Sequence, residues 1–218
     1  FRDGIVMLAA TVFFIVLSLS GLLVWWHGLL LLLFLAGFTV YSYVSEKRTS
    51  PPSKELHEKE AAILVPKPEK PIFLYLLMVL AGILFLMAGS HFFVKGAVII
   101  ARAWGVSEAV IGLSLVAIGT SLPELATSSV AAFKKETDVA VGNILGSNMF
   151  NLLGIIGVTV MIFPMKVPPA ILRFDIWVML AVSLLLLPLL FSQWRLSRKE
   201  GLFLLILYAG YIGYLFKT

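Results

Sequence analysis

The chain has 218 residues, of which 60% are hydrophobic and 13% charged, and its formal net charge is +5. This hydrophobicity excludes an ordinary soluble domain and predicts an all-α polytopic membrane protein. Because the sequence contains no cysteine, a disulfide framework and a thiolate metal site are also excluded. Basic cytoplasmic loops explain the positive charge of a membrane chain, so we expect a lipid bilayer and no nucleic acid as partner.

Seven apolar segments are predicted to be transmembrane helices. In chain order they cover residues 4–24, 28–45, 72–103, 108–133, 139–163, 170–193 and 200–216. The third segment is longer than one crossing requires, so we expect it to tilt or to extend beyond the bilayer. Residues 46–70 are rich in Lys, Glu and Pro and are predicted to form a solvated linker. A signal peptide is disfavoured because the first apolar run is too long and lacks a small-residue cleavage site.

The distribution of basic residues predicts the orientation of these helices. If the linker is cytoplasmic, twelve basic residues lie inside and four outside, while Lys95 lies within a helix. The C-terminus is then external, and a prokaryotic cell membrane is the expected location. The inside group is Arg2, Lys47, Arg48, Lys54, Lys59, Lys67, Lys70, Lys134, Lys135, Arg195, Arg198 and Lys199, and the outside group is Arg102, Lys166, Arg173 and Lys217.

The first two predicted helices resemble the last two. Asp3, Met7 and Ala9 match Asp175, Met179 and Ala181, and Gly28, Gly37 and Tyr41 match Gly201, Gly210 and Tyr214. Corresponding positions of the two copies are five helices apart, an odd number, so the copies have opposite orientations, as in the inverted repeats of secondary transporters. The predicted organisation is two helices of a first repeat at 1–45, a cytoplasmic linker at 46–70 and a five-helix second repeat at 71–218. About three further helices are expected to precede this sequence, by analogy with inverted repeats.

A single carboxylate lies deep within the fourth predicted helix. Glu124 is the only acidic residue in the otherwise uncharged stretch Ala109–Phe133. A charge at that depth costs at least about 2.5–3.5 kcal/mol and therefore indicates a functional site. Pro123 has no backbone N–H, so the carbonyl of Gly119 loses its helical partner and must be met by protein, water or a bound ion. Together these features predict a cation site.

Polar residues form two stripes around this position. Ala117, Thr120, Ser121 and Glu124 share one face of the fourth helix, and Asn143, Ser147 and Asn151 share one face of the fifth. Their hydroxyl, amide, carbonyl and carboxylate oxygens suit Na⁺ and Ca²⁺ better than transition metals.

Other roles are open to these residues. The polar residues of the fifth helix, and its Gly142 and Gly146, are also typical of helix–helix packing. Glu124 could pair with His91 or Lys95 of the third helix, and Arg102 is expected to anchor the end of that helix.

Two motifs on consecutive helices resemble the second α-repeat of the sodium/calcium exchanger family of cation/Ca²⁺ antiporters. They are Ala117-Ile118-Gly119-Thr120-Ser121-Leu122-Pro123-Glu124 and Val141-Gly142-Asn143-Ile144-Leu145-Gly146-Ser147-Asn148-Met149-Phe150-Asn151, within residues 108–163. The resemblance covers the chain from the fourth to the tenth helix of that family's ten-helix fold. It implies Na⁺/Ca²⁺ antiport by alternating access, with no resident cofactor. It also implies that Glu124, Thr120, Ser121, the Ala117 carbonyl, Ser147 and Asn151 bind the transported ions.

The resemblance has two departures. Some members carry Asp where this chain has Asn151, which argues against an additional cation such as K⁺. The first α-repeat is absent, although Ca²⁺ takes six to eight oxygens and favours more than one carboxylate. We therefore expect the missing repeat, or a second chain in an antiparallel homodimer, to complete the site.

Three alternative functions compete with Na⁺/Ca²⁺ antiport. Ca²⁺/H⁺ exchange is open because a carboxylate can carry a proton. An intramembrane enzyme is disfavoured because no base accompanies Ser121 or Glu124. A non-transporting membrane scaffold is the last alternative, since half a site need not transport ions.

Overall fold

A computed structural model of the chain describes residues 2–48, 71–106, 108–191 and 197–216. These residues are almost entirely helical, which confirms the predicted all-α class. They fall into two compact units, the first formed by Phe1–Val44 and Thr127–Ile206 and the second by Ser45–Ala126 and Leu207–Thr218. Most of the predicted linker, residues 49–70, lies outside the described residues.

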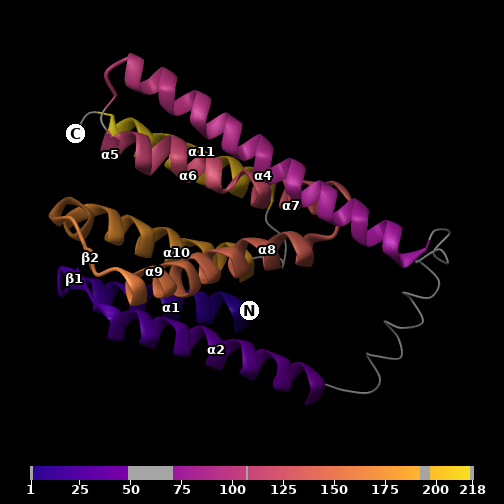
Figure 1. The fold of residues 1–218 in the computed structure, drawn as a ribbon. Helices are drawn as coiled ribbons and strands as arrows, with labels where there is room; N and C mark the ends of the chain where they lie inside the picture. Colours follow the sequence, from indigo (N-terminus) through magenta and orange to yellow (C-terminus); the bar gives the residue numbers. More distant parts are fainter. Residues whose placement is uncertain (1, 49–70, 107, 192–196, 217–218) are drawn as a thin grey trace. The chain divides into compact units, whose positions relative to one another are not determined.

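The first unit is a helical bundle with one short pair of strands (Figure 1). Its helices overlap the four predicted segments of this unit. One of these segments also contains a short strand, and two contain a π-helical turn. In chain order the elements are α1 (Arg2–Ser18), β1 (Leu22–Leu23), α2 (Trp25–Arg48), α8 (Thr137–Met149), the π-helical turn η2 (Phe150–Ile155), α9 (Ile156–Ile162), β2 (Met165–Lys166), the π-helical turn η3 (Ile171–Asp175) and α10 (Ile176–Phe191).

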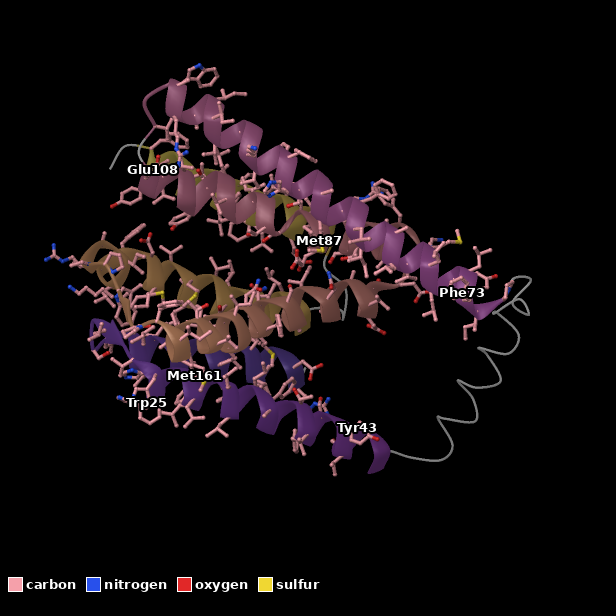
Figure 2. The ribbon with its side chains drawn as sticks, viewed as in Figure 1. Trp25, Tyr43, Phe73, Met87, Glu108 and Met161 are labelled. Atoms are coloured by element: carbon pink, nitrogen blue, oxygen red, sulfur yellow. The ribbon has the colours of Figure 1, made fainter. Side chains whose placement is uncertain are left out.

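Buried apolar side chains from three parts of the sequence form the core of this unit. Ala10, Leu31 and Leu153 have no exposed surface and pack together, joining α1, α2 and η2. Gly28 of α2 lies so close to α9 that a Cβ atom would be 2.5 Å from the Gly157 carbonyl oxygen. Figure 2 shows Met161 of α9 at this end of α2, and its Cγ would be 2.8 Å from the same Cβ. The first two helices are thus held against the helix that carries the second polar stripe.

The two strands link the loop after α1 to the loop after α9. β1 and β2 pair antiparallel, with Leu22 opposite Lys166 and Leu23 opposite Met165. The predicted first helix, 4–24, therefore ends six residues early, because Gly21 adopts a φ of +74° that no helix continues through.

The second unit contains the longest helix of the described residues. α4 (Ile72–Ala103) has the predicted bounds, and its 32 residues would extend about 48 Å, well beyond a hydrocarbon core of about 30 Å. Side chains such as Phe73 and Met87 project from it and are exposed (Figure 2). Against α4 pack α5 (Glu108–Ile111), the π-helical turn η1 (Gly112–Val116) and α6 (Ala117–Thr120).

Two helices continue from one unit into the other. α7 (Leu122–Phe133) crosses the boundary after Ala126, and α11 (Arg198–Leu215) crosses it after Ile206.

Among the described residues, four helices are long and apolar enough to cross a membrane. A bent helix pair formed by Ser114–Thr120 and Leu122–Phe133 could supply a fifth span. Two of the seven predicted spans correspond to α1 and α11, which have 17 and 18 residues and lie at the short end of the range for a crossing. The chain is an all-α polytopic membrane protein, and the full count of seven spans stays a prediction. The four spans are Trp25–Ser45, Ile72–Ala103, Thr137–Ile162 and Ile171–Leu189.

Candidate ion-binding site

The helix that carries Glu124 is broken where the sequence predicts an interruption. α6 ends at Thr120, α7 begins at Leu122, and the two are bent by 51° at Ser121. Pro123 occupies the first turn of α7, where a missing N–H does little harm to the new helix. The missing N–H instead affects the preceding segment, because the Gly119 carbonyl has no amide donor at residue 123.

A side chain from α4 meets this carbonyl. The hydroxyl of Ser90 donates a hydrogen bond to the Gly119 carbonyl oxygen. One turn further along α4, the Cγ2 atom of Val94 fills the space where a Cβ of Gly119 would lie. Of the three partners that the sequence allowed for this carbonyl, the structure therefore shows protein.

Ala117, Thr120 and Ser121 surround the break, and all three are exposed. The Thr120 hydroxyl lies 3.0 Å from the Val116 carbonyl oxygen and 3.1 Å from that of Ala117, to which it can donate. The Ser121 N–H lies 3.3 Å from the Ala117 oxygen. A hydroxyl that donates its proton backwards along the helix keeps its oxygen lone pairs for a cation. These oxygens are therefore chemically suited to bind Na⁺ or Ca²⁺.

Glu124 lies in the first turn of α7 as a direct consequence of the break. The positive end of the helix dipole attracts a carboxylate at that position. The residue is half-buried, and its Oε2 atom has almost no solvent-exposed surface. A negative charge withdrawn from solvent beside exposed hydroxyl oxygens is an arrangement that attracts a cation.

The second stripe lies on α8 and η2 in the first unit. Asn143 donates both protons of its side-chain amide, to Thr127 Oγ1 at 2.9 Å and to Ser128 Oγ at 2.8 Å. Its Oδ1 atom is the oxygen of this amide and has the chemistry of a cation ligand. The Ser147 hydroxyl donates to the Ile144 carbonyl at 3.1 Å, and Asn151 lies exposed within η2.

The two polar stripes lie in different units. Ala117, Thr120, Ser121 and Glu124 lie in the second unit, whereas Asn143, Ser147 and Asn151 lie in the first. In the part of the chain that the structure describes, no three His, Asp or Glu side chains form a metal-binding group. A cation held here would depend on neutral oxygens around one carboxylate.

The structure shows the neighbours of two basic residues of α4, Arg102 and His91. Arg102, predicted to anchor the helix end, forms a two-point ion pair with Glu108, with N–O distances of 2.7 and 2.9 Å. This pair ties the end of α4 to the start of α5. The His91 ring lies against Phe92, with ring centroids 5.8 Å apart.

A cavity of about 320 Å³ lies in the second unit, beside the end of α4. Ala101, Val106 and Leu115 are among the residues that line it, and all the lining residues are apolar. It offers no side-chain oxygen for a cation and is therefore not the ion site.

Sequence reasoning missed three polar residues near the stripes. Ser90, Thr127 and Ser128 each accept or donate a hydrogen bond between helices. Their signal was present, because serine and threonine in apolar helices commonly bond across to a neighbour. The sequence could not identify which neighbour each residue meets.

Comparison with known proteins supports the motifs. The model of the family described as sodium/calcium exchanger protein matches residues 74–217. The putative antiporter CaxA of Alkalimonas amylolytica is 40% identical over 96 residues, which are 43% of this chain and 30% of that protein. The sodium/calcium exchanger MaX1 of Methanosarcina acetivorans is 42% identical over 78 residues, which are 36% of this chain and 22% of that protein.

A third relative is the inner membrane protein YrbG of Escherichia coli strain K12, which is 36% identical over 90 residues, or 41% of this chain and 27% of that protein. The matched regions thus span less than a third of the length of each of these relatives. No solved structure matches the chain significantly.

Proposed function

Because the chain belongs to the sodium/calcium exchanger protein family, as its motifs predicted, we propose that it is part of an antiporter that exchanges Na⁺ for Ca²⁺ by alternating access. The relative MaX1 is named a sodium/calcium exchanger and CaxA a putative antiporter, so ion exchange rather than enzymatic turnover is the expected activity. A prokaryotic cell membrane is the proposed location, with residues 46–70 cytoplasmic and the C-terminus external.

The observation that carries this proposal is the broken helix at Ser121. It places Glu124 in the first turn of a new helix, next to the oxygens of Ala117, Thr120 and Ser121. Broken helices are typical of substrate sites in secondary transporters, where unwound carbonyls and the C-terminal ends of half-helices coordinate cations. We propose that Glu124 is the carboxylate shared by Na⁺ and Ca²⁺ and that the three neighbouring residues supply neutral oxygens.

The second stripe is proposed to supply the remaining ligands of this chain. The bonds from Asn143 to Thr127 and Ser128 fix one level of the antiparallel pair α7 and α8. We propose Ser147 and Asn151 as ion ligands because they belong to the second motif that resembles the sodium/calcium exchanger family.

This ligand set carries one negative charge, which is too little for a divalent cation at membrane depth. Ca²⁺ takes six to eight oxygens, commonly from more than one carboxylate. We therefore propose that a further repeat outside this sequence, or a second chain, supplies another acidic half. Ca²⁺ and Na⁺ are then transported substrates, and no resident cofactor is involved.

The test uses the complete protein, purified and reconstituted into vesicles loaded with Na⁺. An outward Na⁺ gradient should drive Ca²⁺ uptake, and Glu124→Gln should abolish it because the charge that balances the cation is lost. Glu136→Gln is the matched control, since it makes the same change at an exposed carboxylate in the turn between α7 and α8.

Each other outcome identifies a different function. Uptake that ignores the Na⁺ gradient but follows a pH gradient would establish Ca²⁺/H⁺ exchange instead. Unchanged flux and Ca²⁺ binding in Glu124→Gln would refute the assigned site and favour a membrane scaffold.

A further inference from the structure

The carbonyl of Gly119 occupies a critical position in the broken helix. In the sequence Gly119 lies between Ala117 and the pair Thr120 and Ser121, which are the proposed neutral ligands. In a continuous helix the N–H of residue 123 would bond to it, but Pro123 has none. At the end of α6 a backbone N–H of the helix cap bonds to this carbonyl instead, and a carbonyl oxygen can accept a second hydrogen bond. A donor on a neighbouring helix can therefore add to the bond that the cap supplies.

Ser90 supplies that donor from a different helix. Its hydroxyl donates to the Gly119 carbonyl oxygen, across 29 residues of sequence. The approach depends on the absence of a side chain at Gly119, because the Val94 side chain occupies that space. Ser90 and Val94 are four residues apart on α4 and so lie on one face of it. The face of α4 that carries Ser90 and Val94 therefore contacts Gly119, two residues before the break at Ser121.

We propose that Ser90 is a positioning residue, which adds a donor from α4 to the carbonyl whose regular helical bond Pro123 cannot make and so fixes the orientation of the ion ligands around Gly119. This role rests on the proposed function, since the ligands it orients are those assigned to Na⁺ and Ca²⁺. Holding the peptide plane after Gly119 also holds the backbone of Thr120, and with it the direction of the Thr120 hydroxyl. Ser90 itself need not touch an ion.

A coupling between two residues follows. Ser90 and Pro123 act on the same carbonyl oxygen, one by donating to it and the other by failing to donate. Pro123→Ala restores the backbone N–H, so the Gly119 carbonyl regains its helical partner. Loss of the Ser90 hydroxyl should therefore matter in the native protein and matter little in the Pro123→Ala background.

The first experiment measures Ca²⁺ uptake by the complete protein in vesicles. Ser90→Ala should raise the half-saturating Ca²⁺ concentration about tenfold, equivalent to about 1.4 kcal/mol. Ser90→Thr, which keeps the hydroxyl, should restore a value near that of the native protein. Ser183→Ala is the matched control, because the Ser183 hydroxyl donates at 2.8 Å to the Met179 carbonyl of its own helix. An unchanged half-saturating concentration in Ser90→Ala would overturn the proposal.

The second experiment is a double-mutant cycle of the native protein, Ser90→Ala, Pro123→Ala and the double variant. It measures their thermal unfolding midpoints in detergent and does not depend on transport. Ser90→Ala should lower the midpoint in the native background and leave it nearly unchanged in the Pro123→Ala background. Equal losses in both backgrounds would show that Ser90 does not compensate for the bond that Pro123 cannot make. A native protein that transports no Ca²⁺ would refute the proposed function, while this cycle would still decide the role of Ser90.

Discussion

At the scale of single residues, close approach between helices gives the sharpest prediction. Gly28→Ala should destabilise the protein by about 1–3 kcal/mol, because the new methyl group would overlap the Gly157 carbonyl and Met161. Gly37→Ala is the control in the same helix, since nothing lies within 4 Å of its Cβ position. It should be neutral or slightly stabilising, as alanine favours helix over glycine by about 1 kcal/mol. The thermal unfolding midpoint in detergent measures both effects. Equal midpoints for Gly28→Ala and Gly37→Ala would contradict this packing.

The same scale shows how far single residues can be interpreted without a structure. Pro123 predicted the break and the loss of the regular helical bond to the Gly119 carbonyl, because both follow from a missing N–H on the same chain. Ser90 as the donor could not be predicted, because any of several polar side chains on other helices could have reached that oxygen. The same limit on prediction applies to any residue whose hydrogen-bond partner lies far away in the sequence.

Hydrogen bonds between elements provide a second prediction. Thr127→Val with Ser128→Ala should weaken Ca²⁺ uptake to the same degree as Asn143→Leu, because each change removes the bonds joining α7 and α8. Combining all three substitutions should add nothing further, as expected for residues that act as one group. The measured quantity is the half-saturating Ca²⁺ concentration in vesicles.

The control for this cycle removes equivalent hydroxyls elsewhere. Thr159→Val with Ser183→Ala deletes two hydroxyls that donate to carbonyls of their own helices, and it should leave uptake unchanged. Fully additive effects of Asn143→Leu and the Thr127/Ser128 pair would instead indicate that Asn143 acts independently, as a direct ion ligand through Oδ1.

Helix ends give a third prediction, because two helices end with the same hydrogen-bond pattern. After α4 the N–H groups of Gly105 and Val106 bond to Arg102 and Ala101, and after α7 those of Lys135 and Glu136 bond to Ala132 and Ala131. This is the Schellman pattern, whose penultimate residue takes a positive φ. Gly105 has a φ of +77°, whereas Lys135 has +64°.

A left-handed conformation costs a residue with a side chain about 1–2 kcal/mol, and glycine avoids that cost. Lys135→Gly should therefore stabilise the protein by about 1 kcal/mol, and Gly105→Ala should destabilise it by a similar amount. In a chain of this size about 1 kcal/mol shifts the unfolding midpoint by about 2–4 °C. Shifts in the same direction for the two variants would contradict the assigned helix ends.

Among the elements, hydropathy predicted the positions of the helices well and their internal irregularities poorly. The bounds of α4 agree with the prediction because a long apolar run has no competing signal. The turns η1 and η2 were not predicted, because one extra residue per turn leaves the apolar composition unchanged. The pairing of β1 with β2 was missed because it joins two loops more than 140 residues apart.

At the scale of the whole molecule, the polar stripes show what sequence alone can establish about a transporter. The motifs predicted the family, and the family model confirms it over residues 74–217. The residues that complete a divalent-ion site could not be assigned, because the oxygens of this chain include one deep carboxylate and Ca²⁺ favours more.

The orientation of the chain in the membrane supplies the last prediction. Twelve basic residues on the linker side against four on the other predict a cytoplasmic linker and an external C-terminus. The sequence contains no cysteine, so Ser53→Cys and Thr218→Cys each add one thiol, after replacement of any cysteine elsewhere in the complete protein. A membrane-impermeant maleimide applied to intact cells should label the cysteine at 218, and that at 53 only after permeabilisation. The reverse pattern would invert the predicted topology. Labelling of both positions from outside would indicate two opposite insertions, the arrangement in which a second copy of the chain could supply the other half of the ion site.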